Sequence, residues 1–283
     1  MRSISCLLIF IFLAFPFQPA SAKNVSKVAV IIHPEEVDSA DDIEAAIIEA
    51  TDHGTHPGTV ILDGQNGAFI FTGADRSLNI FVSNLTLQGV NRAIIENCDD
   101  GLFFDDFPLQ DIIIEGISFL CTGDGVEATG SFQDVTLRDN VFWAENNGIG
   151  VNGLSSGWLV TDNYIQSDWD AMNLTGAKGF TITNNLLSGY NGMVLLRDNQ
   201  FQVRHNAIRA TYQGIFLGQE SWENMVQKNT VFGVNYAGIS LEQGVVGNRI
   251  LTNQVICATD TGCRTICATP DVVQGNKIAG NKP

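Results

Sequence analysis

Acidic side chains collect beside a series of short apolar triplets in the middle of this chain. Glu127 belongs to the first such group, Glu145 precedes the next triplet, and Asp168 and Asp170 precede the one after it. Two carboxyl groups held roughly 5 to 9.5 Å apart can cleave a glycosidic bond, one as acid and one as base or nucleophile. We therefore treat Glu145, Asp168 and Asp170 as candidate catalytic residues, and Glu127 and Asn173 as candidate ligand-binding residues.

An aromatic residue stands two positions before the small residue that leads each of four successive triplets, namely Ala171, Gly192, Gly214 and Gly238. The aromatic residues are Trp169, Tyr190, Tyr212 and Tyr236. Aromatic faces pack well against the C–H faces of sugar rings, so a row of them could form a platform for a glycan. The alternative is an inward stack that fills a corner of the core, and simple strand alternation from Met172 or Met193 favours this arrangement.

One interval between repeated positions, from Asn97 to Pro108, is longer than the others and contains four aspartates and three phenylalanines. Closely spaced carboxylates suit Ca²⁺, which prefers oxygen ligands. The segment lacks the spacing of an EF-hand loop, so a solvated acidic loop that protrudes from the fold is the alternative. The candidate calcium ligands are Asp99, Asp100, Asp105 and Asp106.

Two ladders of repeated residues indicate how these distant side chains are brought together. The first is Asn140, Asn163, Asn185, Asn206, Asn229, Asn253 and Asn276, and the second is Gly125, Gly148, Ala171, Gly192, Gly214, Gly238 and Gly262, both with a period of about 23 residues. Period-two alternation within each repeat predicts short strands. Such strands bury an apolar face only when each repeat stacks on the next, at about 4.8 Å. The sequence therefore predicts an all-β fold, a parallel β-helix of about nine or ten coils.

This pattern resembles the right-handed parallel β-helix superfamily, also called pectate-lyase-like, in which an Asn ladder fills one corner between two sheets. The resemblance covers roughly residues 60–282. It implies that a ligand lies along the sheet that contains the triplets. It also implies that carboxylates hold Ca²⁺ and a basic side chain removes a proton. By this resemblance the acidic cluster is Glu127, Glu145, Asp168 and Asp170, and the catalytic base is Arg197.

Several signatures of that superfamily are missing from this chain. It contains no Gly-His-Gly motif of the polygalacturonases, no Asp-Pro-His of the alginate epimerases and no Trp-Ile-Asp-His of the pectate lyases. These subfamilies are therefore disfavoured, and the fold by itself does not define an activity.

The amino-terminal residues predict export and a cap. Arg2, an apolar run over residues 7–17 and the small residues at 20–22 are typical of a signal peptide over residues 1–22. The apolar run is shorter than the roughly 20 residues that cross a bilayer, so we expect no membrane span and a secreted protein, extracellular or periplasmic. Residues 23–57 are expected to form a strand and a capping helix, because Ser39 and Asp42 have the spacing of a capping box. Residues 58–283 are expected to form the β-helix.

Charge and cysteine content narrow the possible partners. The formal net charge of −16 argues against nucleic acid as a partner. Five cysteines follow the predicted signal, and the three between positions 257 and 267 predict one disulfide in the last coils. Cys263 occupies the phase of a core residue in the triplets. We expect a monomer.

Two classes of function fit these features. The first is a polysaccharide lyase or glycoside hydrolase that acts on an extracellular polysaccharide. Its one candidate cofactor is Ca²⁺, and we expect no other. The second is a non-catalytic β-helix that binds glycan or serves as an adhesive or structural surface protein.

Overall fold

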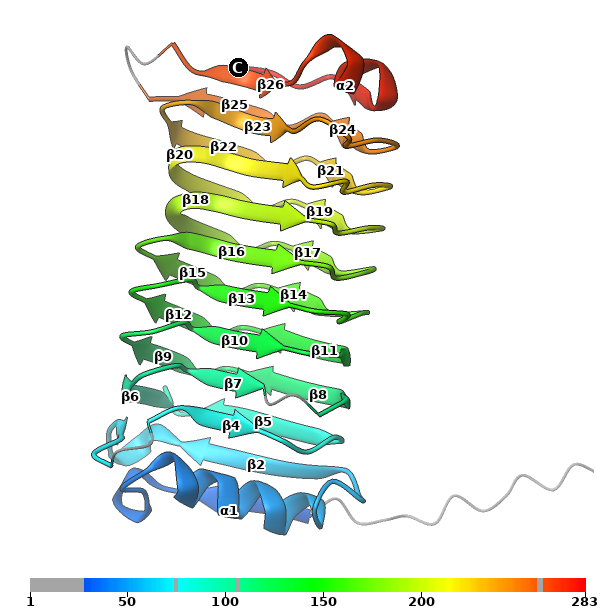
Figure 1. The fold of residues 1–283 in the computed structure, drawn as a ribbon. Helices are drawn as coiled ribbons and strands as arrows, with labels where there is room; N and C mark the ends of the chain where they lie inside the picture. The colour runs from blue at the N-terminus through cyan, green and yellow to red at the C-terminus, as the bar shows by residue number, and fades with distance from the viewer. Residues whose placement is uncertain (1–27, 74–75, 105–106, 259–261) are drawn as a thin grey trace, which may run out of the picture.

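Each turn of the chain consists of three short strands that pair in parallel with the equivalent strands of the turns before and after it. The structure, a computed structural model, describes residues 28–73, 76–104, 107–258 and 262–283, and the predicted signal peptide lies outside these residues. The result is a parallel β-solenoid of about nine turns, which confirms the predicted fold class (Figure 1). No helix within the described ranges is long and apolar enough to cross a membrane.

Face 1 of the solenoid is an 11-stranded sheet that runs from one end to the other. Its strands are β1 (Val28–Ile32), β2 (Gly58–Asp63), β5 (Leu85–Val90), β8 (Leu109–Glu115), β11 (Phe132–Arg138), β14 (Leu159–Thr161), β17 (Thr181–Thr183), β19 (Gln202–Arg204), β21 (Met225–Gln227), β24 (Arg249–Leu251) and β27 (Lys277–Ala279).

Faces 2 and 3 share two long strands, β18 (Leu186–Leu196) and β20 (Ala207–Gly218), which bend across the corner between them. Face 2 also contains β3 (Phe69–Ile70), β6 (Ile94–Cys98), β9 (Ser118–Cys121), β12 (Val141–Ala144), β15 (Tyr164–Ser167), β22 (Thr230–Val234) and β25 (Gln254–Cys257). Face 3 contains β4 (Leu78–Ile80), β7 (Leu102–Phe104), β10 (Val126–Thr129), β13 (Ile149–Asn152), β16 (Asp170–Thr175), β23 (Ala237–Leu241) and β26 (Arg264–Cys267).

The predicted Asn ladder lies at the corner between faces 1 and 2, where the rungs from Asn140 to Asn253 are buried. Its last member is Asn281, because the backbone N–H and side-chain Nδ2 of Asn253 both donate to Asn281 Oδ1 at 2.9 Å. The prediction of Asn276 as the last rung was therefore wrong. Asn276 instead ends a second ladder with Asn224 and Asn248 at the corner between faces 3 and 1. The short helix α2 (Pro270–Gly275) lengthens the last turn and shifts the phase.

The amino-terminal end of the core is covered by helix α1 (Ala40–Thr51), as the sequence predicts (Figure 1). The capping box is present, with the Ser39 backbone N–H donating to Asp42 Oδ2 at 3.1 Å. Ile43 and Ile47 are fully buried against the first turn, so the helix hides an apolar cross-section that would otherwise face water. Two short 3-10 helices, Pro34–Glu36 and Gly64–Asn66, complete this end.

The acidic segment 97–108 is not a protruding loop as a whole. Leu102 pairs with Val126 and Phe104 with Ala128, so β7 is an ordinary face 3 strand. The apolar residues that follow Ala93 resemble a glycine-led triplet but form β6 on face 2, and the residues that made this interval look longer than the others include the face 3 strand β7. Phe104 is buried whereas Phe107 is 62% exposed.

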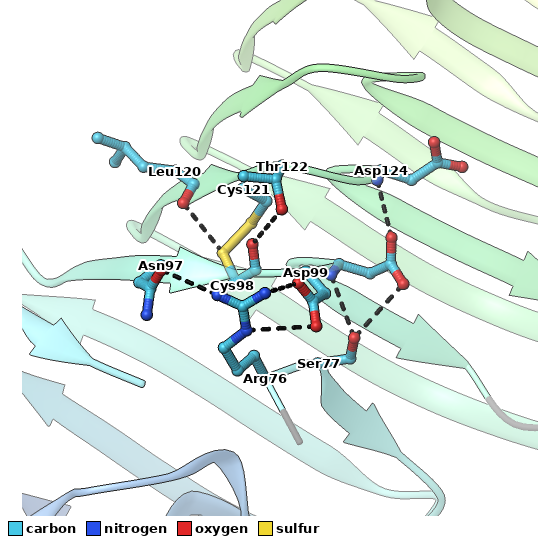
Figure 2. Close-up of a disulfide and its surroundings, with 10 residues drawn as sticks. Arg76, Ser77, Asn97, Cys98, Asp99, Leu120, Cys121, Thr122 and Asp124 are labelled. Carbon is cyan, nitrogen blue, oxygen red and sulfur yellow. Dashed lines mark hydrogen bonds and ion pairs between the residues drawn. A yellow bond between two sulfur atoms is a disulfide. The ribbon is translucent and has the colours of Figure 1, made fainter. Parts of the chain in front are cut away.

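Cysteines link neighbouring parts of the chain. Cys98 and Cys121 form a disulfide between successive turns (Figure 2). Cys257 pairs with Cys263, which confirms the predicted carboxy-terminal disulfide. Cys263 is thus not the core residue of a triplet. Ile266 occupies that position, paired with Ile239.

Candidate functional site

The corner between faces 2 and 3 carries a second polar row, two positions before each face 3 triplet. The register aligns Asp100, Asp124, Asn147, Asp170 and Asn191 along the axis. Asp124 donates its backbone N–H to Asp100 Oδ1 at 2.8 Å (Figure 2). Asn147 in turn donates its backbone N–H to Asp124 Oδ1, also at 2.8 Å. These bonds fix the carboxylates in successive turns. The sequence signal for this row is a polar residue that recurs two positions before each triplet. Asp100 was not assigned to the row from the sequence, because it was placed in the acidic segment 97–108.

A groove opens beside this row on face 3, with a volume of about 570 Å³. Its lining comprises Asp100, Asp124, Glu127, Asn146, Asn147, Trp169, Asp170 and Asn173. Four of these side chains are carboxylates, and none carries a positive charge. We call this the face 3 groove.

The floor of the groove is open because one strand position lacks a side chain. Glu127, Gly150 and Asn173 are aligned in successive turns, so glycine separates the two polar side chains. A Cβ atom at Gly150 would lie 3.0 Å from Asp124 Oδ2. The depression over Gly150, about 200 Å³, is continuous with the groove through Asp124, Glu127 and Asn173. Glycine therefore leaves room for a ligand between the carboxylates.

The carboxylates of the groove differ in the groups that surround them. Burial raises the pKa of Glu127, and the negative charges of Asp100 and Asp124 raise it further. Burial also raises the pKa of Asp170, but its oxygens accept hydrogen bonds from Asn191 Nδ2 at 2.8 Å and Asn173 Nδ2 at 2.9 Å, which lower it. Glu127 is thus the carboxyl group better placed to hold a proton, and Asp170 the one better supported as an anion.

Burial raises the pKa of Asp124 as well. The backbone and side-chain hydrogen bonds from Asn147 oppose this effect, and the charge of Asp100 adds to it. Asp124 is therefore a structural link in the polar row as well as a source of negative potential beside Glu127.

The aromatic row faces solvent, with exposed fractions between 37% for Tyr212 and 66% for Trp169. The prediction of an inward stack was wrong, because it placed the aromatic residues an even number of positions before the buried methionines. Tyr190 lies an odd number of positions before the buried Met193, and β18 bends there, with its register to β20 shifting between Gly189 and Asn191.

The row is nevertheless not a continuous platform for sugar faces. Tyr190 and Tyr212 stack at 5.4 Å between ring centroids, and Tyr212 and Tyr236 at 5.1 Å, with interplanar angles of 9° and 11°. Their faces cover one another, so the stack presents mostly ring edges and hydroxyl groups to solvent. Trp169 makes no ring contact of this kind within the described residues, and it borders the face 3 groove. Trp169 is therefore the residue of this row best placed to contact a sugar ring.

The structure separates the predicted catalytic residues into three places. Asp170 lies in the face 3 groove, whereas Glu145 and Asp168 line concavities on face 2. Arg197 follows the last residue of β18, at the opposite edge of face 3. Six residues of strand separate it from Asn191, the neighbour of Asp170, which corresponds to about 20 Å. The fold does not bring Arg197 to the carboxylates.

The candidate calcium ligands are likewise dispersed. Asp99 forms an ion pair with Arg76 (Figure 2). Asp100 belongs to the polar row. Asp105 and Asp106 lie outside the described residues. Within the described part of the chain no three His, Cys, Asp or Glu side chains are arranged to hold a metal ion. Calcium binding stays a prediction.

Comparisons with known proteins agree with this architecture. A family model described as "Periplasmic copper-binding protein (NosD)" matches residues 146–283. Among solved structures, the DFA-IIIase of Arthrobacter chlorophenolicus A6 in complex with GF2 is similar, with a TM-score of 0.60, 12% identity and coverage of 81% of this chain and 79% of that one. The same enzyme without its lid gives a TM-score of 0.56, 14% identity and coverage of 90% and 94%. No curated protein sequence matches the chain.

The fold, the two Asn ladders and these neighbours together define the class. The chain has the parallel β-helix fold that these neighbours share. At such low identity the DFA-IIIase structures establish only the shared fold.

The described residues do not fit a copper site of the kind that the NosD description implies. Copper favours imidazole and sulfur ligands. His33, His53 and His56 lie beside the amino-terminal cap. His205 follows β19, the eighth strand of face 1, and the free Cys267 lies in the last turns. Since these side chains do not converge, we derive no chemistry from copper.

Proposed function

We propose that this protein binds a polysaccharide along the face 3 groove and hydrolyses its glycosidic bonds. The observation that carries the proposal is the pairing of Glu127, whose raised pKa favours the acid, with the amide-supported anion Asp170 across the glycine floor at Gly150. Trp169 at the rim supplies an exposed aromatic face for a sugar ring.

In the proposed reaction Glu127 donates its proton to the glycosidic oxygen as the bond to the anomeric carbon breaks. A water molecule attacks that carbon and transfers a proton to Asp170, so hydrolysis leaves one carboxyl group protonated and one ionised. Glu127 and Asp170 lie on strands two turns apart, and Glu127 is in register with Asn173, whose Nδ2 donates to Asp170 Oδ2 at 2.9 Å. The proposed mechanism requires a separation of roughly 6.5 to 9.5 Å between the two carboxyl groups, which leaves room for the water and leads to inversion at the anomeric carbon.

Two comparisons support the ligand class and the location. DFA-IIIase, whose complex with GF2 shares this fold, is a carbohydrate-active enzyme. The NosD family is described as periplasmic, in keeping with the signal peptide that we expect over residues 1–22 and with export of this chain.

The test is a panel of pectin, alginate, glucuronan and neutral glycans, together with GF2, assayed with and without Ca²⁺. Reducing ends report hydrolysis, and absorbance of an unsaturated product reports lyase chemistry. We expect new reducing ends without unsaturated product. Glu127→Gln should lower kcat by about 10²- to 10⁴-fold while binding is retained. Glu220→Gln, a change at an exposed carboxylate on another corner, is the matched control.

Other outcomes of the panel are equally decisive. Unsaturated product that disappears in Arg197→Ala would replace hydrolysis with lyase chemistry. Glycan binding without any cleavage would favour the non-catalytic alternative. Failure of every glycan to bind would refute the proposal.

A further inference from the structure

Face 2 carries a groove that the proposed hydrolysis does not use. Two concavities of about 360 and 390 Å³ adjoin there, since Gln166 and Asp168 line both. One extends toward Leu120 and Trp143, and the other toward Arg209. We call these two adjoining concavities the face 2 groove.

The register gives this groove a regular lining. One outward row contains Leu120, Trp143, Gln166, Ser188 and Arg209, each paired with the next. Four steps of about 4.8 Å give the row a length of about 19 Å, which suits a short stretch of an extended chain.

The chemistry of the lining suits sugar rings. Trp143 is 47% exposed and packs on one side against Tyr164, with 6.0 Å between centroids. The Tyr164 hydroxyl donates to Gln166 Oε1 at 2.7 Å, which holds both side chains in place. Ser167 also lines the groove, is 6% exposed, and its hydroxyl has no hydrogen-bond partner among the described residues. An exposed aromatic face beside amide and hydroxyl groups is the combination that binds carbohydrate.

The charges of the groove argue against a purely ionic ligand. Its charged lining residues are Glu145, Asp168 and Arg209, so both signs are present and the net charge of the lining is only −1. The face 3 groove, by contrast, is lined by four carboxylates. The corner that carries Trp169 and Tyr190 lies between the two grooves, because Asp168 on one side and Asp170 on the other flank Trp169.

We infer that the face 2 groove is a second glycan-binding site, which holds an uncharged polysaccharide segment without cleaving it. The inference takes its ligand class from the proposed function but concerns different residues. A non-catalytic site on the neighbouring face would keep the protein bound to its polysaccharide while a glycosidic bond is hydrolysed in the face 3 groove.

The test is affinity electrophoresis in native gels that contain hydroxyethyl cellulose, xylan or polygalacturonate. The variants are Trp143→Ala, Trp169→Ala and the double variant, with Trp222→Ala as control. Trp222 is 41% exposed but lies on another corner, outside both grooves. Circular dichroism checks that each variant is folded.

We expect Trp143→Ala to weaken retardation by a neutral glycan about tenfold, with unchanged kcat on a short soluble oligosaccharide. Trp169→Ala should affect both quantities, the double variant should migrate as if no glycan were present, and Trp222→Ala should match the wild type. If Trp143→Ala behaves as the wild type while Trp169→Ala loses binding, the second site is refuted and the proposed function stands.

The remaining outcomes separate the two ideas. Loss of binding in Trp143→Ala alone, with Trp169→Ala and Glu127→Gln unchanged, would support the face 2 site and refute the face 3 site. Retardation by polygalacturonate only would refute the uncharged ligand class, and retardation by none of the three glycans would refute the second site.

Discussion

Asn163 donates two hydrogen bonds to the Oδ1 atom of Asn185 one turn along the solenoid, from its backbone N–H and from its side-chain Nδ2, both at 3.0 Å. The same Nδ2 donates to the Leu137 carbonyl at 2.9 Å. Each rung therefore satisfies a backbone group of the turn before it. This relationship repeats down the corner and makes every turn depend on its neighbours.

Asn185→Ala should lower the free energy of unfolding by about 1 to 3 kcal/mol for each buried partner left unsatisfied, because Asn163 loses its acceptor and the Val160 carbonyl its donor. Denaturant titration measures the loss. Asn152→Ala removes an exposed amide from β13 and should change stability little. Equal stability of the two variants would contradict a structural role for the ladder.

Asp100→Asn should shift the alkaline limb of the kcat/KM profile to lower pH. The raised pKa of Glu127 results first from burial and then from the charge of Asp100, so removing that charge lets Glu127 lose its proton earlier. Asparagine retains an oxygen that can accept the Asp124 backbone N–H, so the corner should keep its shape. An unchanged limb would show that Glu127 is not the acid.

Gly150→Val should weaken glycan binding about tenfold or more without unfolding the protein, because a side chain there fills the floor beside Asp124. Valine suits a β-strand, so the fold should tolerate it. Thr181→Val on face 1 serves as the control for an outward strand position away from both grooves. Unchanged affinity in isothermal titration would mean that the ligand lies elsewhere.

Asp198 should make stability fall as pH rises. Burial raises its pKa to about 8, its side chain is fully buried, and Oδ2 has no hydrogen-bond partner among the described residues. The folded protein therefore holds the proton more tightly than the unfolded chain. This contribution to the free energy of unfolding is complete below the ordinary carboxyl pKa. It falls as the pH rises from that value to about 8, by as much as about 1.4 kcal/mol per pH unit.

Asp198→Asn removes this titration while its amide oxygen still accepts the Ala177 backbone N–H. Denaturant titrations at pH 5 and pH 8 should show a smaller difference for the variant than for the wild type. The hypothesis fails if both proteins have the same pH dependence.

The disulfide between Cys98 and Cys121 should contribute about 3 kcal/mol, since it closes a loop with a sequence separation of 23 residues. Replacing both cysteines by alanine should lower the denaturation midpoint and make it insensitive to reductant at that site. The pair Cys257 and Cys263, with a separation of 6 residues, closes a shorter loop and should contribute less, about 2 kcal/mol. A larger loss from the second pair would contradict this order.

The repeat of about 23 residues predicted the solenoid and most of its Asn corner, because identical side chains at a fixed period have only one way to stack. Prediction failed where local sequence imitates the repeat. Ala93 resembles the start of a triplet but belongs to face 2, and α2 shifts Asn276 into the other ladder. In both places the tertiary register, and not the local pattern, decides which strand a segment joins.

The candidate site was only partly predictable for a related reason. The sequence alone determined that Glu127, Asp168, Asp170 and Trp169 lie near one corner of a solenoid, since period and phase fix the turn on which a residue lies. Only the tertiary structure decided that Asp168 and Asp170 serve opposite sides of that corner, that Asp100 joins the polar row and that the tyrosines cover one another's faces. The direction of a side chain at a bend depends on the backbone path between two sheets, which alternation along a single strand does not encode.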